Sequence, residues 1–376
     1  MKPLSTLNYF KKNIKKILIL STSIGFAILF IYILSVTIKT VDLSQELIDS
    51  NPTEHFSIII DRTEEGIPDE IIDEILQHPS TERTIGIWSV NTYYTHLMGG
   101  TMGVGIWFLN EVDSLYLLDK LQLQIKEGRL PQPGAKELAL HELLLQNKGL
   151  RLGDKIGNSI ISTEWIPGSY EIVGVLEGES ITGFGVLEPD VDDELLMKNM
   201  MMIFHKDGKL DDSNRFLNEL IPKEMSLITN KNVKELMEEN NRALYSVLNI
   251  TLIVAIFVLS VTIGNSTYLQ FFERKKEYAL LRALGFSRGW IFGKAFREIA
   301  ITSLVGLLFG VVLTGIVLIL FIFLVFAKTG APFQLFDLRA SINSLTIVAS
   351  ALIFCLIPVW IFLGKINVIE TIERGE

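Results

Sequence analysis

Two short stretches of the chain carry residue types that bind phosphate or zinc, and neither has the complete pattern. Gly289 and Gly293, followed by Lys294, resemble part of a phosphate-binding loop. Three residues instead of four separate the glycines, and Ala295 occupies the position of the Ser or Thr that would hold magnesium. The chain is therefore not expected to bind ATP itself, and no catalytic residue is assigned.

The metal-binding patterns are also incomplete. His141 and Glu142 resemble the start of a zinc-protease helix, but Leu145 stands where the second histidine must be. The acidic stretch 188–194 offers oxygen ligands for a divalent cation but lacks the spacing and the glycine of a calcium loop, which favours a solvated loop. A single cysteine, Cys355, excludes an intrachain disulfide and a cysteine-based metal site. No metal and no cofactor are predicted.

The strongest candidate for a functional site is a charged stretch, residues 271–298, between two long apolar segments. Short basic loops between membrane spans face the cytoplasm under the positive-inside rule, and this one has seven basic residues against three acidic ones. The basic residues are Arg274, Lys275, Lys276, Arg282, Arg288, Lys294 and Arg297, and the acidic ones are Glu273, Glu277 and Glu298.

The first half of this loop predicts a short helix. Residues 274–284 contain no Gly or Pro and consist mainly of good helix formers. Tyr278, Leu281 and Leu284 recur at near-helical spacing and are expected to line one face. A helix with an apolar face and a basic flank suits docking to a soluble partner. The alternative is a loop that only anchors two spans through its charges.

A sharp break is expected after this helix. Gly285 favours the left-handed conformation that ends many helices. Ser287 can then cap a second helix that continues into the next apolar segment.

Four uncharged segments are long enough to span a bilayer, which takes about 20 residues. They are residues 17–38, 243–272, 299–327 and 340–364. An even number of spans places both termini on one side. Because the spans carry no charged residue between their ends, the sequence offers no ion relay inside the membrane and argues against a secondary transporter.

Charge also predicts the orientation. Residues 1–16 contain five lysines and no acid, and they read as an amphipathic helix on the inner leaflet, in contact with lipid. We therefore expect both termini, including the tail 365–376, in the cytoplasm. Residues 39–242 and the short loop 328–339 then lie outside.

The large outer segment, residues 39–242, is strongly acidic. It holds 36 acidic and 18 basic residues, a net charge of −18, whereas the whole chain carries −9. Phosphate binding requires a basic face, so nucleic acid is not an expected partner. A cationic ligand is permitted, although surface acids also serve solubility.

The outer segment predicts a mixed α/β domain. Residues 55–61 and 84–90 read as strands on either side of an amphipathic helix, 67–77. Further strands are expected at 137–140, 170–176 and 200–204, and a helix at 142–148. Residues 97–109 are rich in Gly and apolar side chains, and we interpret them as a loop, either tucked under the core or exposed toward ligand or lipid. The last part, 230–245, is expected to form one continuous helix with the second span.

The third span contains Gly306 and Gly310, separated by three residues. This spacing permits close packing of helices in lipid, although glycine is common in spans.

The segment ERKKEYALLRALGFSRGWI, residues 273–291, followed by Glu298 and a Gly-rich span, resembles the signature of the FtsX-like permease family. Parts of residues 128–179 resemble the extracytoplasmic domain of MacB-type members. One span, a large outer domain and three further spans also match these members, so the resemblance extends over nearly the whole chain.

The resemblance implies a membrane subunit of an ABC transporter in the bacterial cell (inner) membrane. Such subunits pair as homo- or heterodimers and recruit a separate ATPase. The loop between spans two and three resembles the coupling helix that sits in a cleft of the ATPase. The matching residues here are Glu273, Arg274, Lys275, Glu277, Tyr278, Leu281, Arg282, Leu284, Gly285, Ser287 and Arg288. In MacB-type relatives, closure of the ATPase moves the outer domain through the second-span helix.

Members of the family differ in function. Some export antibiotics or peptides and some extract lipoproteins, whereas others only transmit force to cell-wall hydrolases. The leading hypothesis is a transporter permease subunit, and the second is a non-transporting mechanical regulator. A third hypothesis, a membrane-bound sensor or anchor, predicts no ATPase partner.

Overall fold

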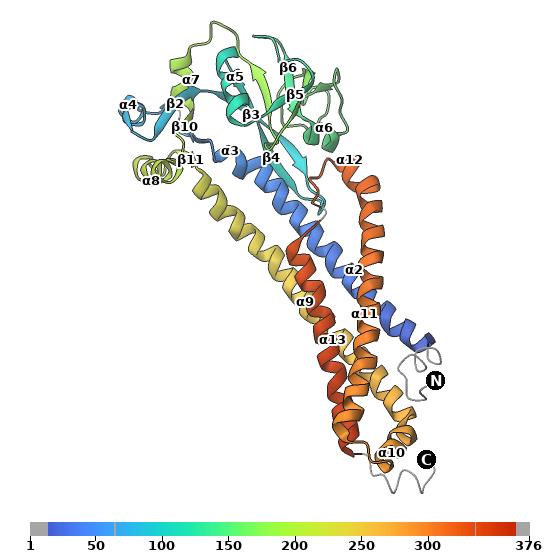
Figure 1. The fold of residues 1–376 in the computed structure, drawn as a ribbon. Coiled ribbons are helices and arrows are strands. Elements are labelled where there is room, and N and C mark those ends of the chain that lie inside the picture. Colours follow the sequence, from blue (N-terminus) through green and yellow to red (C-terminus); the bar gives the residue numbers. More distant parts are fainter. Residues whose placement is uncertain (1–13, 64, 335, 366–376) are drawn as a thin grey trace. The chain divides into compact units, whose positions relative to one another are not determined.

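The structure, a computed structural model, describes residues 14–63, 65–334 and 336–365. The chain divides into two units (Figure 1). One unit, named the permease unit here for the family that residues 273–291 resemble, consists of Met1–Ile38, Leu244–Phe321 and Gln334–Glu376. The outer unit consists of Lys39–Ala243 and Ile322–Phe333.

Four helices among the described residues are long and apolar enough to cross a membrane. They are α2 (Ile14–Gln45), α9 (Asn230–Glu273), α11 (Arg288–Phe321) and α13 (Leu338–Lys365). The α/β domain is inserted between the first and second of them, so the predicted fold class is confirmed. Most of the predicted helix 1–16 and nearly all of the tail 365–376 lie outside the described residues.

The second span and the segment before it form one helix. The predicted continuous rod is confirmed, since α9 runs unbroken from Asn230 to Glu273 over 44 residues. At 1.5 Å per residue such a helix is about 66 Å long. Its length exceeds what a bilayer requires by a wide margin, so the helix continues beyond the apolar span.

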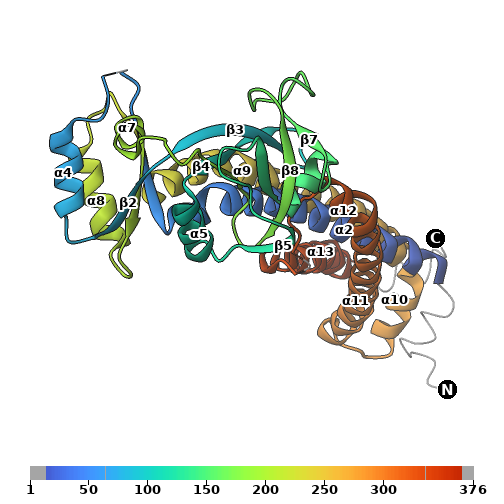
Figure 2. The ribbon, with the colours of Figure 1, turned by 90° about the horizontal axis from the view of Figure 1, so that it is seen from above.

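The outer unit contains two sheets. The four-stranded sheet has the order β11-β1-β10-β2, with antiparallel neighbours. Its strands are β11 (Ser226–Ile228), β1 (Phe56–Ile60), β10 (Met200–His205) and β2 (Thr81–Gly86). Helices α4 (Asp69–Gln77) and α8 (Leu210–Leu220) lie side by side (Figure 2) and pack on one face of this sheet through Ile75, Leu217 and their neighbours.

The larger sheet is mixed and has the order β3-β4-β9-β6-β8-β5, with β7 paired to β8. Strands β4 and β9 are parallel, as are β6 and β8, and the other neighbours are antiparallel. The strands are β3 (Trp88–Thr95), β4 (Thr101–Leu109), β5 (Gln124–Gly128), β6 (Glu137–His141), β7 (Lys155–Ile156), β8 (Tyr170–Glu177) and β9 (Gly183–Val186). The remaining helices of this region are α3 (Asn51–Thr53), α5 (Glu111–Lys120), α6 (Glu142–Lys148) and α7 (Asp193–Asn199).

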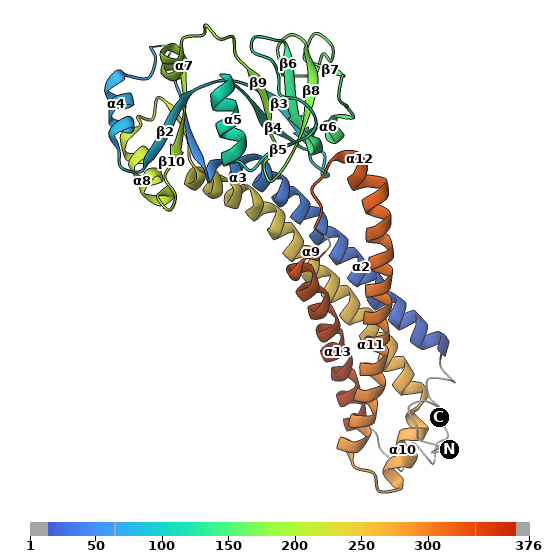
Figure 3. The same ribbon diagram turned by 45° about the horizontal axis from the view of Figure 1, so that its top comes forward.

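The two sheets lie next to each other (Figure 3), and an apolar core joins them. Phe56 of β1 meets Trp107 of β4 edge to face, with ring centroids 5.3 Å apart, and Phe204 of β10 lies 5.6 Å from Phe56. Aromatic side chains bury large apolar areas and favour such geometries. These rings hold the two sheets together.

The interpretation of residues 97–109 as a loop is wrong. Most of this segment is β4, which pairs with β3 in a hairpin and with β9 on its other side. Val104, Ile106 and Phe108 are buried in one core, while Trp107 and Leu109 are buried in the other. The apolar side chains on both faces outweigh the low strand propensity of the glycines.

The segment 322–333, predicted as the end of the third span and part of an outer loop, belongs to the outer unit. It forms two short helices, the π-helical η2 (Ile322–Phe326) and α12 (Ala327–Thr329). Tyr94 donates a hydrogen bond to the Gly330 carbonyl at 3.0 Å, and Asn147 donates one to the Thr329 carbonyl at 2.7 Å. A Cβ on Gly330 would lie 2.1 Å from a carbonyl of α6, so only glycine fits there.

Candidate functional site

A short helix, α10 (Lys275–Ala283), follows directly after α9. Arg274 separates the two helices and has a non-helical backbone, with φ −99° and ψ 13°. The prediction of a helix between the second and third spans is therefore confirmed. The helix and the residues around it form the candidate site, and all of them belong to the permease unit.

One face of α10 packs within the permease unit. Tyr278, Ala279 and Leu281 are buried in a small apolar cluster. The cluster is completed by Ile291 and Ala295 of α11 and Val359 of α13. Burial of this face fixes α10 against two of the spanning helices.

The sequence predicted that Tyr278, Leu281 and Leu284 line one docking face. In the structure these side chains do not share one exposed face. Tyr278 and Leu281 are only 0% and 3% exposed, because they provide the contact with α11 and α13. Leu284 is 68% exposed, and Leu280, which the sequence analysis did not single out, is 56% exposed. An external partner would therefore meet Leu280 and Leu284, while Tyr278 and Leu281 position the helix.

Gly285 ends α10 as the sequence predicts. Its φ of +90° lies in the region that favours glycine. The Gly285 amide donates to the Arg282 carbonyl at 3.0 Å, and the Phe286 amide donates to the Leu281 carbonyl at 3.1 Å. This pair of bonds is a Schellman cap, and Phe286 packs against the same cluster as Leu281.

The predicted cap at the start of α11 is also present. The Ser287 hydroxyl accepts a hydrogen bond from the Trp290 amide at 3.2 Å. The rings of Phe286 and Trp290 lie 4.4 Å apart across this turn. The break between the two helices is therefore held by both hydrogen bonds and ring packing.

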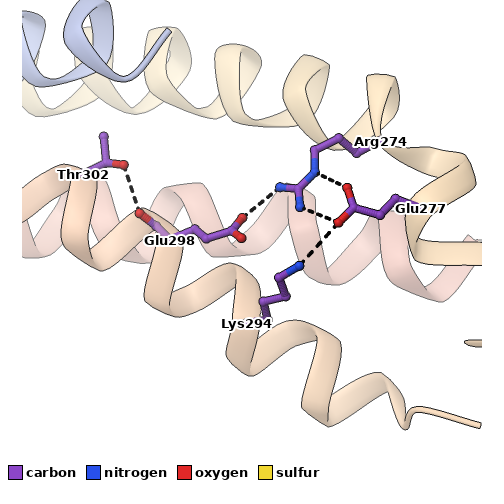
Figure 4. A network of polar contacts seen from close by, with 5 residues as sticks. All are labelled: Arg274, Glu277, Lys294, Glu298 and Thr302. Carbon is purple, nitrogen blue, oxygen red and sulfur yellow. Dashed lines mark hydrogen bonds and ion pairs between the residues drawn. The ribbon is translucent and has the colours of Figure 1, made fainter. Parts of the chain in front are cut away.

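A network of ion pairs joins the loop to α11 (Figure 4). Arg274 donates to both carboxylate oxygens of Glu277, at 2.8 and 3.0 Å. Its third nitrogen donates to Glu298 at 2.8 Å. Lys294 approaches Glu277 at 3.4 Å. Arg274 thereby clamps α10 to α11 from the point where α9 ends.

The two acids of this network differ in environment. The hydrogen bond from Arg274 lowers the pKa of Glu277 below its usual range, despite partial burial. Glu298 is 5% exposed, and its Oε1 has no hydrogen-bond partner among the described residues. Glu298 therefore depends on Arg274 for compensation of a buried charge.

Sequence reasoning did not predict Lys294 and Glu298 as partners in this network. They lie four residues apart on one helix, which places them on the same side of α11. That spacing, next to the apolar third span, was the available signal. The contact with Arg274 itself depends on how α10 folds back, which spacing alone does not reveal.

The other predicted coupling residues surround this centre. Glu273 is the exposed last residue of α9, and Lys275 is the half-buried first residue of α10. Arg282 lies in the last turn of α10, and Arg288 is the exposed first residue of α11. The structure thus brings these residues together at one end of the helices of the permease unit.

Gly306 and Gly310 lie where α11 crosses α2. A Cβ on Gly306 would lie 2.9 Å from the Cβ of Ile24, and one on Gly310 would lie 3.1 Å from the Cα of Gly25. Ser21 donates a hydrogen bond to the Thr302 carbonyl in the same contact, at 3.1 Å. The two glycines therefore permit close helix packing inside the chain.

The incomplete motifs do not form sites in the described part of the chain. Gly289 and Gly293 lie within α11, so they form no phosphate-binding loop. His141 caps α6 by accepting a bond from the Leu143 amide, and burial lowers its pKa. Among the described residues, no group of three or more His, Cys, Asp or Glu is placed to hold a metal ion.

Comparison with known families identifies the C-terminal part. Residues 249–365, which include the candidate site, match the FtsX-like permease C-terminal family. This part of the chain is similar to the family that the signature at 273–291 resembles. Comparison with curated protein sequences gives no match.

Three solved structures are similar to parts of the chain. The periplasmic region of MacB from Actinobacillus actinomycetemcomitans is 11% identical, with 50% of this chain and 93% of that one covered and a TM-score of 0.28. The extracellular domain of the ABC-type transporter YknZ from Gram-positive bacteria is 13% identical, with 46% and 99% covered and a TM-score of 0.26. A domain of a putative permease from Porphyromonas gingivalis is 10% identical, with 47% and 89% covered and a TM-score of 0.25. TM-scores this low carry no weight for function.

Proposed function

We propose that the chain is the membrane subunit of an ABC-type transporter and that α10 is the helix onto which a separate ATPase subunit docks. ATP hydrolysis occurs in that partner and not in this chain. The chain pairs with a second permease protomer, and its motion exports or extracts a substrate such as a peptide, an antibiotic or a lipoprotein. The basic loop and the lysine-rich N-terminus support a cytoplasmic position for the loop and both termini.

The observation that carries this proposal is the two-sided nature of α10 within an FtsX-like permease domain. Tyr278 and Leu281 bury one side against α11 and α13, while Leu280 and Leu284 remain exposed on the other. A helix mounted in this way transmits a push on its exposed side to the spans that hold it. Arg274 adds a charged clamp at the end of α9.

Transmission away from the loop is supported by α9. The helix has no interruption between Asn230 and Glu273, so a displacement at its loop end reaches its other end without an intervening hinge. This is the route by which we propose that ATPase motion reaches the outer unit.

The docking surface is tested by replacing the exposed leucines. Leu280→Ser with Leu284→Ser removes two candidate anchors, each of which contributes about 2 kcal/mol or more if it sits in a well-packed interface. The chain is co-expressed with candidate ABC-type ATPase subunits from the same genome, and co-purification and ATPase activity are measured. We expect the double variant to lose the partner while inserting normally into the membrane.

A matched control is Leu195→Ser, because Leu195 is similarly exposed (59%) but belongs to the outer unit. It should leave co-purification unchanged. If the wild-type chain recruits no ATPase, the sensor or anchor hypothesis replaces the present one. If the leucine pair leaves binding unchanged, the loop only anchors the two spans.

A further inference from the structure

The outer unit contains a cavity of about 320 Å³ that the proposed coupling mechanism does not use. It is lined by residues of both sheets, by the helical segment that precedes β1 and by Val233 in the first turn of α9. Asn91 and Gly103, on its border, are exposed, so the cavity is open to solvent. Cavities of roughly 300 Å³ and above are the size of small-molecule sites.

The hairpin of β3 and β4 forms one wall. Ser89 pairs with Trp107 and Asn91 pairs with Gly105, so these four residues occupy the same face of the hairpin. Gly103 continues this face, and a Cβ there would meet only the Trp165 ring, at 3.8 Å. Gly103 therefore leaves open a space that a side chain would fill, whereas a Cβ on Gly105 would lie 2.9 Å from the Trp107 ring.

The opposite wall is apolar. Phe56, Ile58 and Ile60 alternate along β1 and present one face to the cavity, together with Met200 and Ile228 of the neighbouring strands. A ligand with an apolar body would bury surface against this wall, at about 25 cal/mol per Å².

A single ionisable side chain, Asp49, is among the lining residues. It lies in η1 (Glu46–Ser50), a π-helical segment, and π-helical turns recur at functional sites. Asp49 is exposed, and its backbone carbonyl accepts a bond from Thr53 at 2.8 Å. Among the described residues, no hydrogen bond or ion pair to its carboxylate is found. The cavity thus combines an apolar wall with one carboxylate that has no protein partner there.

We propose that this cavity binds a small organic cation, a molecule with an apolar body and a protonated amine. The apolar body lies against β1, and the ammonium group pairs with Asp49, with Asn91 and Ser89 as neutral polar neighbours. The net charge of −18 over residues 39–242 raises the local concentration of cations around the site. The site requires no ATPase, so it exists whether or not the chain couples to one.

The test uses three probes of the same shape and different charge. 2-Phenylethylamine is a cation at neutral pH, 2-phenylethanol is neutral and 3-phenylpropionate is an anion. Binding of each to the full chain in lipid nanodiscs is measured by calorimetry, with empty nanodiscs as the blank. We expect the amine to bind most tightly. The alcohol should bind about fivefold more weakly, because it lacks the partly exposed ion pair with Asp49. The anion should not bind, because Asp49 repels it.

Two variants locate the binding. Asp49→Asn keeps the shape and should weaken the amine about fivefold without changing the alcohol. Gly103→Leu fills the cavity from a position with open space and should abolish binding of both probes. Glu46→Gln, in the same π-helical segment but not in the lining, should bind all probes as the wild type does.

The proposal is overturned if the amine does not bind, if all three probes bind equally, or if both cavity variants bind like the wild type. Thermal unfolding of each variant checks that the outer unit is folded. Because neither variant touches α10, recruitment of an ATPase should stay normal, so the two proposals fail separately.

Discussion

Two ion networks in this chain differ in how completely their charged atoms are hydrogen-bonded. In the outer unit, Lys148 and Glu164 pair at 2.7 Å with side chains only 3% and 0% exposed. The other oxygen of Glu164 accepts bonds from Thr92 at 2.7 Å and from the Trp165 amide at 2.9 Å. Lys148 also lies 3.5 Å from the centre of the Tyr93 ring. Every charged atom of this pair has a partner.

The network at α10 is less complete. Glu277 is 41% exposed, and Lys294 reaches it only at 3.4 Å. Glu298 is buried, but one of its oxygens has no partner among the described residues. A buried network in which every polar group is hydrogen-bonded favours one geometry strongly. A network with an unsatisfied group stabilises its geometry less, so its side chains can rearrange at a lower cost in free energy. The comparison indicates a rigid joint in the outer unit and an adjustable one at the loop.

The largest loss of stability is expected when the buried Lys148–Glu164 pair is broken. Glu164→Gln leaves Lys148 buried without a counter-charge, which should lower the free energy of unfolding of the outer unit by about 3–5 kcal/mol. Thermal unfolding of the purified full chain measures this. Glu142→Gln, which removes one of the two carboxylate partners of the more exposed Lys126, is the control and should cost less than about 1 kcal/mol.

The same comparison separates charge from shape. Lys148→Met combined with Glu164→Leu removes both charges and should restore much of the lost stability, since apolar replacements of a whole buried pair are often neutral. If the double variant is as unstable as Glu164→Gln, the bonds to Thr92 and Trp165 matter more than the charge.

The second effect concerns Arg274. Arg274→Ala leaves Glu298 buried without its cation and removes both bonds to Glu277. We expect a cost of about 2 kcal/mol, confined to the loop, since charge-assisted bonds contribute roughly 1.5–3 kcal/mol. Hydrogen exchange of α10 amides should become faster while that of the outer unit is unchanged. Arg288→Ala, at an exposed position, serves as the control, and equal exchange in both variants would contradict the clamp.

The loop shows what the sequence could predict about this site. Its helix, its glycine cap and its serine cap depend on local residue types at Gly285 and Ser287, and these predictions hold. Which side of α10 is buried depends on α11 and α13, which are distant in sequence. The leucine at 281 was therefore assigned to the outside, and the exposed Leu280 was overlooked.

The outer unit shows the same division. Strands β1, β8 and β10 and helix α6 follow from alternation and stop signals in the sequence. The hairpin strand β4 was missed because its glycines argue locally against a strand, while pairing with β3 and β9 decides the outcome. The Lys148–Glu164 pair joins a helix to an irregular loop, and no periodicity in the sequence connects such positions.

A third effect is a difference in how the stability of the outer unit and of α10 depends on pH. Burial lowers the pKa of His205 in the outer unit to about 4, whereas an unfolded histidine titrates near 6.5. The unfolded chain therefore takes up a proton as the pH falls below 6.5, and the folded outer unit does not until the pH approaches 4. Stability should fall through this window, by about 1 kcal/mol at pH 5.5.

Unfolding of the outer unit between pH 7.5 and 5 measures this decline, and His205→Asn should reduce it, while the lowered pKa of the buried His141 maintains part of it. Glu277 responds differently, because its lowered pKa keeps it ionised throughout the same window. Hydrogen exchange of α10 should thus stay unchanged at a pH where the free energy of unfolding of the outer unit has already fallen. A parallel decline of both regions would remove the distinction between them.

The smallest effect is expected at Glu277. Glu277→Gln keeps the shape of the side chain, and Arg274 retains Glu298 as its partner. Because the Glu277 carboxylate is substantially exposed, water and salt already screen its ion pairs, so the cost should be below about 1 kcal/mol and should vanish at high salt. Hydrogen exchange of α10 at low and high ionic strength measures it. Comparison with Glu298→Gln is decisive: an adjustable joint requires the buried acid to matter more than the exposed one. If Glu277→Gln releases α10 as fully as Arg274→Ala does, the exposed pair holds the helix, and the loop is as rigidly fixed as the outer unit.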